Sequence, residues 1–264
     1  MGEAFIMGDI GIPQWTNNDE GKILSVINNK LTWIPLEMFN SNTSNLEYRW
    51  IITPSTTTIY NQFNMILNET ETGTEWICPS DGTYIIQLHA SGGTGGNSET
   101  YTSSELISGV LYSNVVSASG GGGGGSGAKI ELDLTEGTTY PISVSTDVTT
   151  FDTYYCNRGE NGTDGKTDLD NLTATAGKGG SVGTYSDGMT CIANIGEDGE
   201  VEIQDKGIIT YAIGALGGNG SAFADKNDYK GYGNGSKSPT AIRDGILKAD
   251  TPFNCAIIIR KKIE

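Results

Sequence analysis

Histidine is almost absent from this chain of 264 residues, in which His89 is the only one. A catalytic triad that depends on histidine would rest on this residue alone. The alternation of the strand-like run 83–90 places His89 beside Gln87 on the more polar face, which favours a structural or surface role. No GxSxG, HExxH or P-loop pattern occurs, and no spacing among the abundant carboxylates singles out a glycosidase pair. We therefore expect no catalytic residues and no enzymatic activity.

Cysteines are few and far apart in the sequence. The four are Cys78, Cys156, Cys191 and Cys255. No two are close enough to form a CxxC pair, which excludes a zinc ribbon or a thioredoxin-type motif. We expect buried free thiols, with a Cys156–Cys191 disulfide as the alternative.

Positive charge is also scarce. The chain has 16 Lys and Arg against 32 Asp and Glu, which gives a formal net charge of −16. The phosphates of nucleic acids and the surfaces of anionic membranes repel such a chain. We therefore expect no nucleic-acid partner. The charge is expected to serve solubility, with cation binding as the alternative.

Long apolar runs and helical periodicity are missing. No segment reaches the roughly 18 apolar residues of a membrane-spanning helix. Residues 1–6 have neither the basic nor the apolar region of a signal peptide. We expect synthesis in a cytoplasm and no membrane insertion. The best helix candidate is the short run 45–51.

Glycine, in contrast, is in excess: there are 38, of which 5 lie in residues 1–81 and the other 33 after them. No G-X-Y period runs along the chain, which excludes collagen. The longest run is 120–125, and further clusters occupy 92–96, 177–180, 217–220 and 231–235. Glycine loses more backbone entropy on folding than any other residue, so such runs indicate close packing of backbone or display loops on a β scaffold. Because the run 120–125 lies between strong strands, we expect it to be ordered and close-packed.

Short strands separated by turns account for most of the rest. An expected hairpin joins 21–27 to 30–34 through a tight turn. Further strands are expected at 56–67, 75–79, 83–90, 106–117, 128–134, 139–145, 191–193, 200–203, 208–213 and 255–260. We predict an all-β fold: a β-sandwich or jelly-roll-like domain over 41–264, preceded by a hairpin module over 1–40. Long glycine-rich loops are expected at 152–190 and 217–245.

The region 157–171 combines acidic and amide side chains with glycines. Glu160, Asp164 and Asp168 supply hard oxygen ligands of the kind that calcium prefers. The spacing does not follow the EF-hand pattern, so we expect a solvated loop and no metal site, with calcium binding as the alternative. The glycine clusters lack a G-x-G-x-x-G between a strand and a helix, so no cofactor is expected.

Residues 16–33 read Thr-Asn-Asn-Asp-Glu-Gly-Lys-Ile-Leu-Ser-Val-Ile-Asn-Asn-Lys-Leu-Thr-Trp. This segment resembles the D-E-G-K-hydrophobic-L-x-V-x-x-G-K-hydrophobic-x-W motif of phage fibre and virion appendage proteins, where it forms a small hairpin near an attachment end. Asn29 stands where that family commonly has glycine, and asparagine tolerates the left-handed conformation. The resemblance implies that residues 1–40 dock to another virion protein through apolar anchors. These anchors are Trp15, Ile23, Leu24, Trp33 and Ile34.

A second resemblance runs from about residue 75 to the end. Trp-Ile-Cys-Pro-x-x-Gly-Thr-Tyr-x-Ile-x-Leu is followed by glycine clusters, the polyglycine run and Glu-Gly-Thr-Thr-Tyr-Pro-Ile-Ser-Val. This order is similar to the glycine-rich domain of phage tail proteins, which ends in a PGxxYxVxVG-like segment. Here Thr135-Glu136-Gly137 replaces the Pro-Gly, and Ser145 replaces the last glycine. The resemblance implies a virion component, often a homotrimer, made in the cytoplasm of a bacterial host.

Two functions fit this resemblance. The first is a tail fibre or baseplate appendage that contacts a glycan or protein on the host surface. The alternative is a head fibre, capsid decoration or baseplate subunit with a purely structural role. For the first, we expect contact through aromatic rings on the long loops, because such rings stack on sugar faces and give broad contact area. The candidate residues are Tyr154, Tyr155, Tyr185, Tyr229 and Tyr232.

Overall fold

The computed structural model describes residues 22–27, 30–35 and 48–262, except 61–65, 205–211, 219, 221–230, 242, 244 and 253. The chain forms two compact units, which divide between Glu47 and Tyr48. In the first unit, β1 (Lys22–Ile27) pairs with β2 (Lys30–Pro35) in an antiparallel hairpin, which confirms the hairpin predicted from the sequence. No helix in the described part of the chain is long and apolar enough to cross a membrane.

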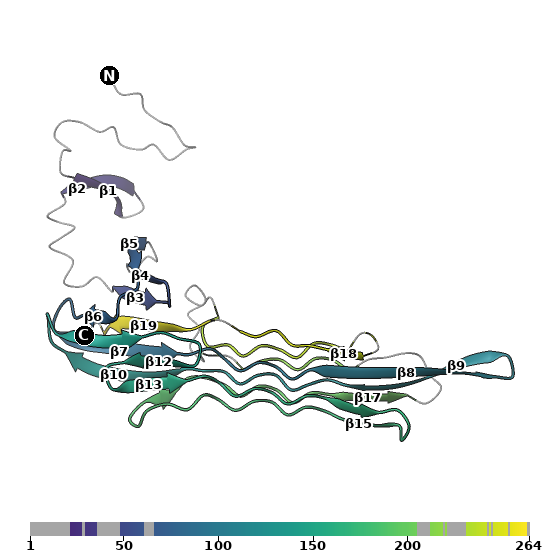
Figure 1. The fold of residues 1–264 in the computed structure, drawn as a ribbon. Coiled ribbons are helices and arrows are strands. Elements are labelled where there is room, and N and C mark those ends of the chain that lie inside the picture. The colour runs from purple at the N-terminus through teal and green to yellow at the C-terminus, as the bar shows by residue number, and fades with distance from the viewer. Residues whose placement is uncertain are drawn as a thin grey trace. The chain divides into compact units, whose positions relative to one another are not determined.

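The second unit begins with a two-sheet base (Figure 1). One sheet has seven strands in the order β16-β10-β7-β19-β3-β4-β5. These are β16 (Thr190–Cys191), β10 (Ala128–Leu134), β7 (Gly82–His89), β19 (Ala256–Lys261), β3 (Arg49–Ile52), β4 (Thr56–Tyr60) and β5 (Ile66–Glu71). The other has the order β13-β12-β11-β6, with β13 (Tyr154–Asn157), β12 (Val148–Phe151), β11 (Thr139–Ser143) and β6 (Glu75–Ile77). The predicted all-β fold is therefore confirmed, and the run 45–51 forms no helix where the structure describes it, because Arg49–Ile52 is a strand.

The core of the base lies between these two sheets. The alternation of β7 places Tyr84, Ile86 and Leu88 on the face that is fully buried. Aromatic rings from both sheets meet them: the centroids of Trp76 and Tyr84 lie 5.7 Å apart in an edge-on arrangement. Such burial supplies the apolar area that fixes the register of β7.

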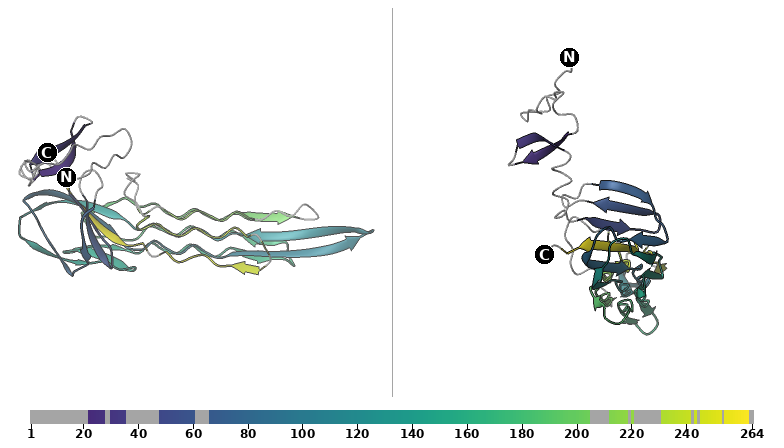
Figure 2. Two further views of the ribbon diagram at one scale, coloured as in Figure 1. Left: turned by 90° about the horizontal axis from the view of Figure 1, so that it is seen from above. Right: turned by 90° about the vertical axis from the view of Figure 1, so that its left-hand side faces the viewer.

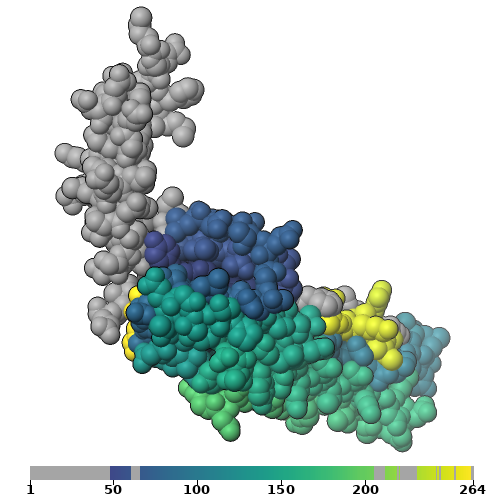
Figure 3. Space-filling model, turned by 60° about the vertical axis from the view of Figure 1, so that its left-hand side comes forward, coloured from purple at the N-terminus to yellow at the C-terminus, as the bar shows by residue number. Residues whose placement is uncertain are grey.

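A bundle of extended segments leads from the base to a distal sheet (Figures 1 and 2). We call it the glycine bundle; its segments are 91–97, 119–127, 158–165, 176–183, 193–200, 212–218 and 232–241. Each of these segments leaves a strand at one end and enters a strand at the other, except where the chain passes through residues that are not described. The space-filling view shows a closed surface on the visible face of this part of the chain (Figure 3).

Segment 119–127 lies at the centre of the glycine bundle. The N–H of Gly121 donates to Thr163, at 3.0 Å, and the N–H of Gly124, three residues later, donates to Glu160 of the same neighbouring segment, at 2.8 Å. Gly122 and Gly125 donate in the same way to 193–200, and Gly123 and Ser126 donate to 232–241. This period of three residues per turn is that of a polyproline II-type helix.

Carbonyl groups of the central segment accept hydrogen bonds from three further segments. Gly121 accepts from 91–97, Gly122 from 176–183, and Gly123 from 212–218. Six segments therefore surround the central one. Three of them accept hydrogen bonds from its N–H groups, and the other three donate hydrogen bonds to its carbonyl groups. Because these residues face neighbouring segments, a Cβ on Gly120, Gly121, Gly122, Gly123 or Gly124 would lie less than 3.0 Å from the backbone of a neighbour.

The central position of the run 120–125 in the glycine bundle explains why it consists of glycine. A Cβ on Gly122 would lie less than 3.0 Å from the carbonyl of Leu216, and one on Gly123 would meet the carbonyl of Gly93 as closely. All of 119–127 is buried. The sequence-based expectation of an ordered, close-packed run is confirmed.

Outer segments carry glycine where their backbone closely approaches either the centre or another outer segment, as Gly92 approaches Asn234 and Gly217 approaches Gly235. In 158–165 the glycines are Gly159, Gly162 and Gly165, and a Cβ on each would meet the backbone of 118–125. The residues between them keep their side chains. The prediction of long loops at 152–190 and 217–245 is therefore wrong for the described residues of these ranges, which include three bundle segments.

Beyond the glycine bundle, the chain forms a four-stranded distal sheet in the order β17-β9-β8-β18. Its strands are β17 (Val201–Gln204), β9 (Val110–Ala118), β8 (Ser98–Ile107) and β18 (Gly245–Leu247). A second hairpin, β14 (Lys166–Asp168) with β15 (Thr173–Thr175), lies at the same end. The apolar stretch 106–117, which is broken at Gly109, contains the last two residues of β8, the turn of the hairpin β8–β9 and all of β9 except its last residue.

Candidate functional site at the distal end

The hairpin β8–β9 extends beyond the other strands of the distal sheet. β18 pairs with β8 only at 98–100, and β17 pairs with β9 only at 115–118. We call the part in between, residues 101–114, the tip hairpin. Figure 2 shows it projecting past the other elements of its end.

The turn of the tip hairpin is made by Ser108 and Gly109, with φ angles of 52° and 81°. Positive φ at both central residues is the geometry of a type I′ turn, whose twist matches that of the flanking strands. The register on either side pairs Ile107 with Val110 and Leu106 with Leu111. The last two cross-strand pairs are therefore entirely aliphatic.

Three of these four aliphatic side chains are exposed, and Ile107 is half-buried. The exposed fraction is 69% for Leu106, 65% for Leu111 and 53% for Val110. Directly opposite residues of a hairpin share a face and successive pairs alternate. Leu106 and Leu111 therefore cover one face of the tip hairpin, and Ile107 and Val110 cover the other. Exposed aliphatic residues gathered at one place mark an interaction site more often than isolated ones do.

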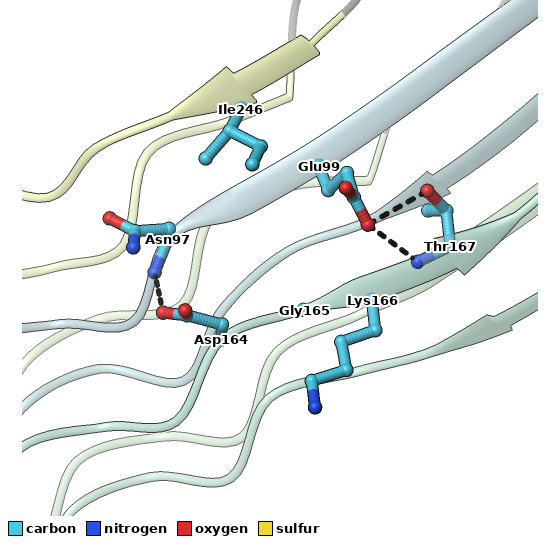
Figure 4. Close-up of a pocket in the computed structure, with 7 residues that line it drawn as sticks. All are labelled: Asn97, Glu99, Asp164, Gly165, Lys166, Thr167 and Ile246. Carbon is cyan, nitrogen blue, oxygen red and sulfur yellow. Dashed lines mark hydrogen bonds between the residues drawn. The ribbon is translucent and has the colours of Figure 1, made fainter.

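A cavity of about 340 Å³ lies at the foot of the distal sheet (Figure 4). Its lining residues are Asn97, Glu99, Asp164, Gly165, Lys166, Thr167 and Ile246. They come from the start of β8, from the end of segment 158–165 with β14, and from β18. The volume is in the range of small-ligand sites.

Both carboxylates in this cavity hold the fold together. Oε2 of Glu99 accepts from the backbone N–H of Thr167, at 2.8 Å, and from its hydroxyl, at 3.0 Å. Oδ1 of Asp164 accepts from the backbone N–H of Asn97, at 2.7 Å. These bonds fasten β14 to β8. The cavity offers hydrogen-bonding groups but no pairing of a nucleophile with a base.

The turn of β14–β15 is fixed in a similar way. Oδ2 of Asp168 accepts from Nδ2 of Asn171, at 2.7 Å, and Oδ1 accepts from the N–H of the same residue, at 3.1 Å. These bonds stabilise the charged carboxylate and lower the pKa of Asp168.

The predicted receptor tyrosines lie at the other end, in or beside the base. Tyr154 and Tyr155 belong to β13, and Tyr185 pairs with Cys156 of the same strand. Tyr154 and Tyr185 pack partly buried against the main core. Tyr232 is only 7% exposed, so it offers no broad contact area.

Of the predicted tyrosines, Tyr155 has the largest exposed fraction among those that the structure describes, at 39%. Tyr229 lies outside the described residues. The predicted tyrosines therefore do not gather on exposed loops where they can be described.

The predicted attachment anchors belong to the first unit. The backbone register pairs Leu24 with Trp33 and Ile23 with Ile34 across the hairpin. Trp15 lies outside the described residues. The structure therefore brings four of the five anchors onto one two-stranded ribbon.

The region 157–171 does not form a cage for an ion. Its acidic residues are spread along an extended segment, and Glu160 and Asp164 are separated by more than one turn of it. Among the residues that the structure describes, no three His, Cys, Asp or Glu side chains gather as metal ligands.

The cysteines are free thiols, and Cys78, Cys156 and Cys255 are buried. Burial raises the pKa of Cys156 and of Cys255, which keeps both thiols protonated. His89 is fully buried where β7 enters the glycine bundle, and lies on the same face as Gln87, as the alternation predicts.

Sequence reasoning missed the tip hairpin, although two signals were present. The glycine period of three in 159–165 marks a stretch of bundle, and the stretch between two bundle segments must therefore belong either to the base or to the distal end. Ser108-Gly109 is also a turn pair between apolar residues. Together these signals locate Leu106, Val110 and Leu111 at a distal turn.

Comparison with protein-family models, with curated proteins and with solved structures found no match for the chain.

Proposed function

We propose that the protein is a structural component of a bacteriophage virion or phage tail-like particle, most plainly a tail fibre or baseplate appendage whose distal end contacts the host surface. The observation that carries the proposal is the glycine bundle. It separates a packed base from a distal sheet by a shaft of roughly 28 Å, at about 3.1 Å per residue over 119–127. A rigid spacer of this kind supports display at a distance and has no evident use in catalysis.

Charge and composition support the same proposal. The distal end carries exposed aliphatic side chains, whereas the chain as a whole has a net charge of −16. The net charge favours the solubility of the protein. The homotrimer implied by the resemblance to fibre proteins stays a prediction.

The contact end can be identified by shortening the tip hairpin. Replacing 106–111 by Asn-Gly removes the two aliphatic pairs and closes the hairpin on the pair Glu105 and Tyr112 with another type I′ turn. We expect binding of the purified protein to cells of the host bacterium to fall by at least about tenfold, which corresponds to about 1.4 kcal/mol. Flow cytometry with labelled protein measures the amount of protein bound to the cells.

The matched control is Tyr155→Ala in the base, which removes a side chain that is 39% exposed and should bind as the wild type does. Loss of binding in this control alone would place the contact end at the base. If neither the wild type nor the variants bind cells, the alternative of a purely structural subunit gains support.

Attachment to the particle is proposed for the first unit. A chain lacking residues 1–40 should fold as the second unit but be absent from purified particles, because the hairpin that carries Leu24 and Trp33 is removed. Immunoblotting of particles assembled with the shortened chain measures its occupancy. Normal occupancy would assign attachment to the base instead.

A further inference from the structure

The tip hairpin is aliphatic on both faces, which a surface that docks against one flat partner does not require. Leu106 and Leu111 lie on one face, and Ile107 and Val110 lie on the other. A groove on a partner protein covers one face of such a ribbon. A fluid apolar medium surrounds both faces at once.

Side-chain chemistry is also graded along the tip hairpin. The turn is followed by the two aliphatic pairs, then by the pair Glu105 and Tyr112, and then by the pair Ser104 and Ser113. Aliphatic groups at the end, a tyrosine behind them and hydroxyls further back match the order of acyl chains, headgroups and water at a lipid surface.

The depth of the aliphatic part fits a shallow insertion. Two cross-strand pairs span about 7 Å at about 3.4 Å per residue. Apolar faces of interfacial segments enter the headgroup and acyl boundary by about 5–10 Å. At this depth the edge N–H and C=O groups of the ribbon still reach water and headgroups, whereas full insertion would leave them unsatisfied.

Charge is nearly absent from this part of the chain. Glu105 is the only charged residue between Thr100 and Ala118, although the whole chain has 32 acidic residues. A lone carboxylate behind the aliphatic pairs suits a zwitterionic headgroup, whose cationic group it can face. It disfavours an anionic surface, and so does the net charge.

We propose that the tip hairpin inserts its two aliphatic pairs into the headgroup region of a zwitterionic lipid surface. The inference deepens the proposed function and rests on it for the identification of that surface with a cell envelope. It replaces the expectation of no membrane insertion, which rested on the absence of long apolar runs and on net charge. A hairpin tip with two aliphatic pairs can insert into a headgroup region without a long run of apolar residues.

The test uses the full-length protein and vesicles of phosphatidylcholine in a flotation assay at physiological salt. We expect the wild type to float with the vesicles. The variant with Leu106→Ser and Leu111→Ser should bind at least about tenfold more weakly. The matched control with Ile213→Ser and Leu216→Ser removes side chains that are 62% and 58% exposed on the glycine bundle, and should float as the wild type does.

Vesicles of phosphatidylcholine mixed with phosphatidylglycerol should bind the wild type more weakly than phosphatidylcholine alone. Unchanged thermal unfolding of each variant shows that the fold is intact. A wild type that binds host cells but stays in the aqueous fraction with every vesicle would overturn the inference and leave the proposed function standing, with a protein or glycan as the receptor. Equal flotation of the tip variant and the wild type would also overturn it.

Discussion

Gly122→Ala and Gly123→Ala should each lower the free energy of unfolding by about 3–5 kcal/mol. The added Cβ meets the carbonyl of Leu216 in the first variant and that of Gly93 in the second, in both cases at less than 3.0 Å. These neighbours are backbone atoms, which no change of rotamer moves away. Overpacking costs about 1–3 kcal/mol and each lost hydrogen bond about 1 kcal/mol, which together give the expected range. Urea denaturation measures the change.

Gly73→Ala is the matched control for this experiment. A Cβ at Gly73 would have its nearest neighbours at 3.8 and 3.9 Å, both in the backbone of Glu75. The same chemical change should therefore alter stability by no more than about 0.5 kcal/mol, since replacing glycine also restricts the unfolded chain. If the bundle variants are as stable as this control, segment 119–127 is not close-packed.

Acidification from pH 7 to pH 4.5 should destabilise the protein steeply through His89. Nδ1 of this buried ring donates to the carbonyl of Ser126, at 3.1 Å. Burial disfavours the imidazolium and lowers the pKa of His89 from 6.5 to about 4. Between these two pH values the unfolded chain binds more protons than the folded one, so stability is fully present above about pH 6.5 and is lost as the pH falls towards 4. The difference corresponds to roughly 3 kcal/mol, at about 1.4 kcal/mol for each pH unit.

The variant His89→Gln separates this effect from the titration of carboxylates. It keeps a neutral side chain at the site and removes the only histidine. Its free energy of unfolding should be lower at pH 7 but much flatter between pH 6.5 and 5 than that of the wild type. Parallel pH profiles for the two proteins would show that His89 does not titrate in the unfolding equilibrium.

Alternation in the sequence was sufficient to predict the central strand β7 of the base, but it did not identify β3 or β13. The run 83–90 alternates apolar and polar residues, and the structure places Tyr84, Ile86 and Leu88 in the core as that period requires. The hairpin at 21–34 was also predictable, because a two-residue turn separates two apolar runs. The alternation of apolar and polar residues is sufficient to predict a strand where one face of that strand is buried.

The glycine bundle was not predictable in the same way. Its hydrogen bonds join segments that are far apart in the sequence, such as Gly123 and Ser236. Glycines that are read as turn signals in an ordinary chain here mark residues whose backbone closely approaches the central segment or another outer one, and the period of three is interrupted wherever a segment enters a strand. The misplacement of Tyr154 and Tyr232 on exposed loops follows from the same misreading.

The distal end was missed because most of β8 is polar. Residues 98–105 contain Thr, Ser and Glu without alternation, so the run 106–117 was read as one strand and its glycine as an interruption. In the structure Gly109 is the turn itself. The exposed pair Leu106 and Leu111 is recognisable only once the register across this turn is known.

The course of the bundle segments determines how the protein bears tension. The tip hairpin continues covalently into two bundle segments, 91–97 through β8 and 119–127 through β9, so a pull on the tip loads these two chains directly and reaches the other segments through the hydrogen bonds between them. A polyproline II-type chain already has about 3.1 Å per residue, against at most about 3.6 Å when fully extended. Such a shaft lengthens by no more than about a sixth before its covalent bonds are strained, and it transmits a displacement of its tip to its base almost without loss.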